Sequence, residues 1–115
     1  SLSPNDIGVF FQLGLLYYQD NNLDAALLAF ERAVALNPDY ANARYFLGLI
    51  YDDKGMKERA IEQFEKILTT NANNEEVIKI LSNLRSGRNA LAEISPPKES
   101  PEKRESPPVE EEGNG

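Results

Sequence analysis

The sequence predicts an all-α protein built from stacked antiparallel helical hairpins. The first observation behind this prediction is an internal repeat with a period of about 34 residues, whose two copies share eight identities in one ungapped alignment. About two identities would be expected by chance from average residue usage. The second observation is that apolar residues recur with the spacing of a helix face rather than that of a strand. The identical pairs are Leu13/Leu47, Gly14/Gly48, Leu15/Leu49, Tyr17/Tyr51, Ala26/Ala60, Phe30/Phe64, Glu31/Glu65 and Asn37/Asn71.

The first hairpin is predicted from its caps and its turn. Ser3 and Pro4 suit an N-cap and the first position of a helix that runs to about Gln19. Apolar residues cover more than one face of this helix, which indicates neighbours on two sides. A polar turn at residues 20–22 leads to a second helix over about residues 23–36. Residues 37–39, Asn-Pro-Asp, are expected to stop this helix and to cap the next one.

The second hairpin repeats the pattern of the first. We expect its first helix over residues 40–54, followed by Gly55, because glycine is the preferred residue just beyond a helix C-terminus. Its second helix is expected over residues 57–70, with its apolar residues on one side. A polar stretch at residues 71–74 then forms the next turn.

A fifth helix is expected over residues 75–86, with Asn74 as its N-cap and Gly87 at its end. It carries a single apolar stripe, as expected of a capping helix at the end of a stack. From Ser95 onward the chain is rich in proline and charge and almost free of apolar residues, which predicts a disordered acidic tail. The solvated face of the fifth helix is predicted to hold Glu75, Glu76, Lys79, Asn83 and Arg85.

These elements divide the chain into four parts. The first repeat covers residues 1–38, the second repeat residues 39–72, the capping helix residues 73–87 and the tail residues 88–115. The chain begins without methionine, so it is expected to be part of a longer protein or to carry a residual terminus, and its lack of a signal peptide pattern says little about location. The cytoplasm is only the default expectation.

The spacing of the repeated residues resembles the tetratricopeptide repeat (TPR), whose signature is W-x2-L-G-x2-Y…A-x3-F…P over about 34 residues. Phe10 stands at the first position of the signature in one copy and Arg44 in the other, while the closing proline is Pro38 in one copy and Ala72 in the other. The resemblance covers residues 5–72 and implies a right-handed α-solenoid. We expect Gly14 and Gly48 to allow close approach of the partner helix at Ala26 and Ala60, and Phe30 and Phe64 to fill the space between hairpins.

The resemblance also implies a concave groove lined by the first helix of each pair. Its aromatic and apolar residues would anchor an amphipathic helix or an extended peptide, and its acidic rim at Asp52 and Asp53 would attract Lys or Arg. The alternative is that these residues pack internally or against another copy. The predicted groove residues are Gly8, Phe11, Leu15, Tyr18 and Gln19 in the first helix and Asn42, Tyr45, Leu49, Asp52 and Asp53 in the third.

Composition argues against most other functions. The chain has neither cysteine nor histidine and a net charge of −7, which excludes disulfides, thiolate or imidazole metal ligands and histidine-based triads, and disfavours nucleic-acid binding. No apolar run reaches the length of a membrane span. The carboxylate clamp by which some TPR proteins bind chaperone tails is not expected, because Phe11, Leu15 and Phe46 stand where cations and amides would be needed.

The carboxylate pairs Asp52/Asp53 and Glu31/Glu65 are expected on solvated faces rather than in a hydrolase site. We therefore expect no enzymatic activity, no cofactor and no metal. Three Ser-Pro pairs in the tail could accept phosphate, but a simple solvated linker is the favoured interpretation. The predicted function is a protein-binding module that holds a protein or peptide segment. The alternative is an assembly element, either part of a longer array or a homo-oligomer formed through Phe10, Phe11 and Tyr18.

Overall fold

The computed structural model describes residues 7–94 and 100–111, and this part of the chain contains helices and turns but no strand. The helix bounds lie within one residue of those predicted wherever both ends are described, whereas the Ser3-Pro4 cap lies outside the described residues. The elements are α1 (Ile7–Gln19), α2 (Leu23–Leu36), α3 (Ala41–Asp53), α4 (Lys57–Thr70), α5 (Glu75–Arg85) and the short 3-10 helix η1 (Pro101–Lys103).

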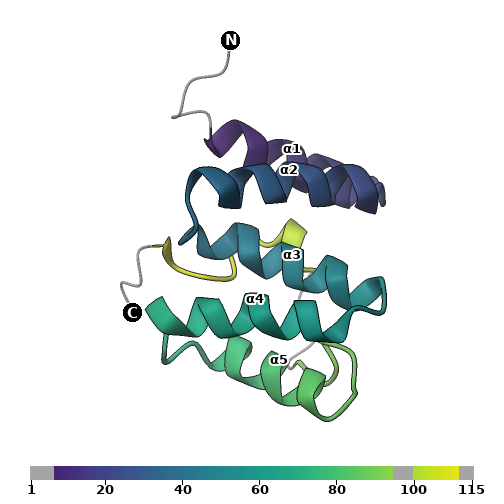
Figure 1. Cartoon of the computed structure of the whole chain (residues 1–115), viewed down its shortest axis with the longest axis vertical. Coiled ribbons are helices and arrows are strands. Elements are labelled where there is room, and N and C mark those ends of the chain that lie inside the picture. The colour runs from purple at the N-terminus through teal and green to yellow at the C-terminus, as the bar shows by residue number, and fades with distance from the viewer. Residues whose placement is uncertain (1–6, 95–99, 112–115) are drawn as a thin grey trace.

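The helices stack in chain order (Figure 1). Helix α1 pairs with α2 and α3 pairs with α4, and these hairpins join because α2 packs against α3. Helix α5 packs on α4 and closes that end of the stack. The predicted all-α hairpin architecture is therefore confirmed. No described helix is both long and apolar enough to cross a membrane.

A phenylalanine ring lies over a glycine inside each hairpin. A Cβ added to Gly14 would come within 2.6 Å of the Phe30 ring, and one added to Gly48 would come closer still to the ring of Phe64. Each glycine therefore accommodates the phenylalanine of its own hairpin, and Ala26 and Ala60 on the same partner helices are fully buried. The predicted role of Phe30 between hairpins also holds, because its ring stacks on Phe46 of α3 with the ring centroids 5.4 Å apart.

Most predicted helix ends are confirmed. Gly55 and Gly87 follow α3 and α5 with φ of +79° and +82°, a region that glycine enters without strain. The side chain of Asn74 accepts a hydrogen bond from the N–H of Val77, which caps α5. The prediction that residues 37–39 cap α3 is wrong. Tyr40 is the N-cap residue of α3 and its side chain makes no capping bond, because the carboxylate of Glu111 fills that place.

The C-terminal part of the chain differs from the predicted disordered tail. Residues 88–94 turn back over α5, and residues 100–111 lie along α1, α3 and α5, beside α3 in Figure 1. Asn83, expected on the wet face, is 0% exposed, because its side-chain amide donates to the carbonyls of Ala90 and Ala92 at 2.9 and 2.8 Å. Composition did not reveal these contacts because many of them use backbone carbonyls and N–H groups, which every sequence carries.

Candidate functional site

The candidate site is the face formed by α1, α3 and α5, which we call the groove face. These three helices occupy the same place in successive repeats, so positions one repeat apart line up across them. Gly8, Asn42 and Glu76 form one such row. Residues 100–111 cross this face and bond to all three helices, through Gln19 of α1, Asn42 of α3 and Glu76 of α5.

The aromatic residues predicted for the groove are integrated into the core. Phe11 contacts the rings of Tyr40 and Phe46, with centroids 5.1 and 6.1 Å away, and Tyr18 meets Phe46 edge-on at 5.4 Å. Phe11, Leu15 and Tyr18 are half-buried, whereas Tyr45 and Leu49 are buried. The structure thus brings the predicted residues to one face, and it places most of their surface against neighbouring side chains.

Asparagine side chains bind the backbone of the segment that crosses this face. The buried amide of Asn42 donates to the carbonyl of Val109 at 2.7 Å and accepts from the Val109 N–H at 3.0 Å. Asn71 donates to the carbonyl of Glu110 at 2.7 Å, and Asn74 makes a longer contact of 3.5 Å with that of Pro108. These contacts do not depend on the side chains of the bound segment. The sequence predicted Asn42 for the site, but interpreted Asn71 and Asn74 only as turn and cap residues.

The N-terminus of α3 binds a carboxylate. Glu111 accepts hydrogen bonds from the N–H groups of Ala41 and Asn42 at 2.8 and 2.9 Å, and from the Asn42 side chain at 2.5 Å. Free N–H groups and the helix dipole favour negative charge at this end of a helix. The groove face therefore holds a carboxylate without the lysines of a carboxylate clamp. Nearby, burial and the charge of Glu111 raise the pKa of Tyr40 to about 12.

Glu76 forms an ion pair with Arg104. The guanidinium of Arg104 donates to both carboxylate oxygens of Glu76 at 2.9 and 3.1 Å, and the hydroxyl of Tyr45 donates to the same carboxylate. Burial, followed by the hydrogen bond to Glu76, raises the pKa of Tyr45. Burial alone would lower the pKa of Arg104, but its bonds to Glu76 raise it. The prediction that Glu76 lies on a solvated face is wrong, because Arg104 and Tyr45 cover it.

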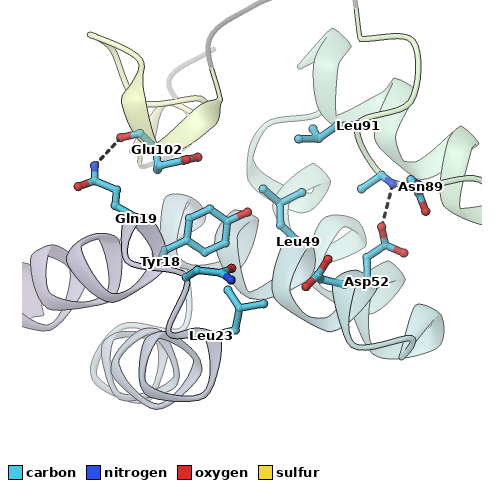
Figure 2. A pocket seen from close by; sticks show the side chains of 11 residues that line it. Tyr18, Gln19, Leu23, Leu49, Asp52, Asn89, Leu91 and Glu102 are labelled. Carbon is cyan, nitrogen blue, oxygen red and sulfur yellow. Dashed lines mark hydrogen bonds between the residues drawn. The ribbon is translucent and has the colours of Figure 1, made fainter.

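A cavity of about 520 Å³ lies at the other end of the groove face (Figure 2). Its wall includes Asp52, which was predicted as an acidic rim residue. Asp52 is instead bound to Lys57 at 2.5 Å and to the N–H of Ala90 at 2.9 Å, while Asp53 is exposed. Burial, with smaller contributions from Glu102 and Asp53, raises the pKa of Tyr18 in this wall to about 12.

The remaining acidic residues that were weighed as catalytic have structural partners. Glu31 accepts a hydrogen bond from the hydroxyl of Tyr51 at 3.0 Å, and Glu65 pairs with Arg85 at 2.7 Å. Within residues 7–94 and 100–111, no group of three or more acidic residues is placed to hold a metal ion. Ser100 and Ser106 of the Ser-Pro pairs are exposed, while Ser95 lies outside the described residues.

A second surface is the outer face of α1. Phe10, Phe11 and Tyr18, proposed as exposed dimer contacts, are half-buried. The residues that are exposed instead are apolar neighbours on another side of the helix, the most exposed being Leu16 at 61%. Their equivalents in α3, one repeat later, are buried where α3 packs on α2. The exposed set is Val9, Leu13, Leu16 and Tyr17, and the equivalent set is Ala43, Leu47, Ile50 and Tyr51.

Comparison with known proteins gives one family. Residues 11–75 match the tetratricopeptide repeat. The chain is 36% identical over 67 residues to a tetratricopeptide repeat domain-containing protein of Arabidopsis thaliana, PYG7, chloroplastic, and covers 22% of it. It is 34% identical over 67 residues to Superkiller protein 3 of Schizosaccharomyces pombe, and covers 5% of it. An uncharacterized protein, ycf37 of Pyropia yezoensis, is 30% identical over 67 residues and is covered to 38%.

In each of these matches, 58% of the present chain is aligned. The chain therefore spans well under half the length of these relatives. What is similar is the repeat region, whereas the residues that complete the groove face, within 76–94 and 100–111, lie beyond the family match.

Proposed function

The chain belongs to the tetratricopeptide repeat family, whose repeats generally mediate protein–protein interaction, and we propose that it binds an extended segment of a partner protein along its groove face. The observation that carries this proposal is the set of asparagine amides, from Asn42, Asn71 and Asn74, that bond to three successive backbone carbonyls. A helix uses its carbonyls internally, so these amides favour an extended segment over a helical one.

The charges of the groove face define the partner further. Glu76 would receive a basic residue, preferably arginine, because a guanidinium can meet both carboxylate oxygens at once. Tyr18 and Leu49 would supply apolar contact at the end of the groove face that holds the cavity. Members of this family typically act as non-catalytic scaffolds, and the same role is proposed for this chain.

Site-directed cross-linking in the native host would identify the partner. A photoreactive residue replaces Gln19, which is exposed at the edge of the groove face, and in a control chain it replaces Glu62, which is exposed on α4. The captured protein is then purified and titrated against the full chain. We expect Leu49→Ala to raise its Kd at least about tenfold, because Leu49 lines the cavity of the groove face and truncation of a central contact typically costs about 2 kcal/mol or more of binding energy.

Leu28→Ala is the matched control, because Leu28 is 68% exposed and lies on α2, away from the groove face. The melting temperature of both variants must first show that they are folded at the titration temperature. An unchanged Kd for the Leu49 variant would reject the groove face as the binding site.

The outer face of α1 supports a second candidate function, that of an element in a longer repeat array. Its apolar residues repeat those with which α3 packs on α2, so the occupant would be the second helix of another tetratricopeptide hairpin. Burying such a face removes apolar surface from water, at about 25 cal/mol per Å². A neighbouring hairpin would therefore stabilise the whole stack.

A duplication tests this second candidate. An additional copy of residues 5–38 is inserted between residues 4 and 5 of the full chain, which keeps the period of the repeat. We expect the melting temperature to rise by about 4 °C or more, the effect of roughly 1 kcal/mol in a domain of this size. The same duplication with Leu16→Glu in the original helix should show no rise. A rise that survives this substitution, or sedimentation showing that the native chain already pairs through this face, would overturn the array hypothesis.

A further inference from the structure

We propose that residues 100–111, which we call the C-terminal strap, are an intramolecular ligand of the groove face, and that a partner must displace them. The inference rests on the proposed function and adds the chemistry of the partner segment. It would carry an arginine, a small apolar residue five positions later and a carboxylate two positions after that, as in Arg104, Val109 and Glu111.

The strap is held at three separate points. At its start, the carbonyl of Glu102 accepts a hydrogen bond from the side chain of Gln19 at 3.2 Å, as Figure 2 shows. In its middle, Arg104 pairs with Glu76, and both side chains are mostly buried. At its end, Val109 is 2% exposed. Contacts with three helices of different repeats are what a groove ligand makes, whereas a simple linker would be solvated.

The polar groups of the groove face find their partners in the strap. Asn42 uses its amide nitrogen and its amide oxygen on the backbone of Val109, and the N-terminus of α3 is capped by Glu111. Leaving buried polar groups without partners costs about 1–3 kcal/mol for each group. When the strap is displaced, a partner segment with the same groups must replace these bonds, which makes the strap a template for the partner.

The composition of the strap suits reversible binding. Pro101, Pro107 and Pro108 restrict its backbone, which lowers the entropy lost on docking. The side chains that hold it are those of Val109, Arg104 and Glu111. They are far fewer than the apolar side chains that form the core of a stable domain. Because it is tethered to the protein, it competes at an effective concentration on the order of 1 mM. A partner in solution therefore binds more weakly than it would bind the open groove face.

The probe is a fluorescently labelled peptide with the sequence of residues 100–111, capped at both ends. It is titrated against the full chain, its Glu111→Ala variant and its Glu110→Ala variant, and binding is followed by fluorescence anisotropy. The two variants lose the same charge at adjacent positions, but the side chain of Glu110 is exposed whereas that of Glu111 caps α3. We expect the peptide to bind the Glu111 variant about tenfold more tightly, and the Glu110 variant like the native chain.

A direct readout accompanies the titration. The side-chain amide NMR signals of Asn42 and Asn71 should shift in the Glu111 variant and stay in place in the Glu110 variant. Circular dichroism checks that the helix content of the variants is unchanged, and Val109→Asp serves as a second variant that undocks the strap without touching the α3 cap. A peptide in scrambled order should not bind.

The failures of the two proposals are distinguishable. Equal Kd values for the native chain and both undocking variants would show that the strap does not compete, which overturns this inference and leaves the groove face as a binding site. A peptide that binds none of the chains would also overturn it. The proposed function would then be tested separately, by titration of the cross-linked partner against the Leu49→Ala variant.

Discussion

At the scale of single residues, each hairpin depends on a phenylalanine ring that lies against a glycine, in the space where another residue would have its side chain. Phe30 and Phe64 occupy the space that a Cβ on Gly14 or Gly48 would need, and both rings are fully buried. Phe30 is further held by its stacking on Phe46, and Phe64 by an edge-on contact with Tyr45. These rings cannot move aside cheaply, because the interior is close-packed.

We therefore expect Gly48→Ala to destabilise the protein. Overpacking costs about 1–3 kcal/mol, and the better helix propensity of alanine returns roughly 1 kcal/mol. The net loss should reach up to about 2 kcal/mol in the free energy of unfolding, measured by urea denaturation. Gly8→Ala is the control, since no atom lies within 4 Å of the added Cβ. A Gly48 variant as stable as the native chain would contradict the packing described here.

At the scale of elements, the turn between the two hairpins and the turn that leads into α5 share one hydrogen-bond pattern. Tyr40 N–H bonds to the carbonyl of Asn37 at 3.0 Å, and Asn74 N–H bonds to that of Asn71 at 3.1 Å. Each bond spans three residues, as in a β-turn, and proline is favoured at the second position of such a turn. The first turn has Pro38 there, whereas the second has the exposed Ala72. The missing signature proline has thus left the turn geometry intact.

Ala72→Pro should stabilise the protein by about 0.4–1 kcal/mol, because proline restricts the unfolded chain more than the native turn. The measurement is the midpoint of urea denaturation, with Asn73→Pro as a control at the next position of the same turn, where proline is disfavoured. A loss of stability in the Ala72 variant would show that the backbone at residue 72 differs from that at Pro38.

At the scale of the whole molecule, the C-terminal strap connects the ends of the stack. It contacts α1 near its start and α3 and α5 further along, so residues far apart in sequence share one face. Its carboxylates also lie near tyrosines of the core. Burial, followed by Glu102 for Tyr18 and Glu111 for Tyr40, raises the pKa of both hydroxyls from 10.0 to about 12.

These shifts predict a loss of stability at alkaline pH. A pKa raised by folding means that the native state favours the neutral hydroxyl, so the contribution is complete below about pH 10 and is lost as pH rises towards 12. Urea denaturation at several pH values from 9 to 12 should show a falling midpoint. The ultraviolet absorbance of the ionised tyrosine ring should rise as the midpoint falls.

Two variants test whether the tyrosines and the strap cause this loss of stability at alkaline pH. Tyr18→Phe removes one ionisable group from the groove face, so the fall in stability should be shallower. Glu111→Ala removes a carboxylate that raises the pKa of Tyr40, so that pKa should move towards its ordinary value. A midpoint that does not change between pH 9 and pH 12 would contradict the assigned shifts.

Much of the fold could be predicted from sequence because its signals are local and repeated. Helix periodicity, the glycines at 55 and 87 and the Asn74 cap each act within a few residues, and the structure confirms them. The predicted groove residues came to one face because positions one repeat apart line up in any regular stack. Among the site residues that were not predicted, Asn71 could have been found most easily, because it repeats Asn37 one period later. It was interpreted only as a turn residue.

By itself, the sequence determined the helices, their pairing into hairpins and the family to which the chain belongs, since these follow from spacing along the chain. Only the tertiary structure decided that Asn83 is buried, that Glu76 receives an arginine and that Glu111 caps α3. The physical reason is that these contacts join backbone and polar groups about 7 to 70 residues apart. Such contacts leave no periodic pattern and no apolar run, so a polar, proline-rich segment gave no sign that it would dock.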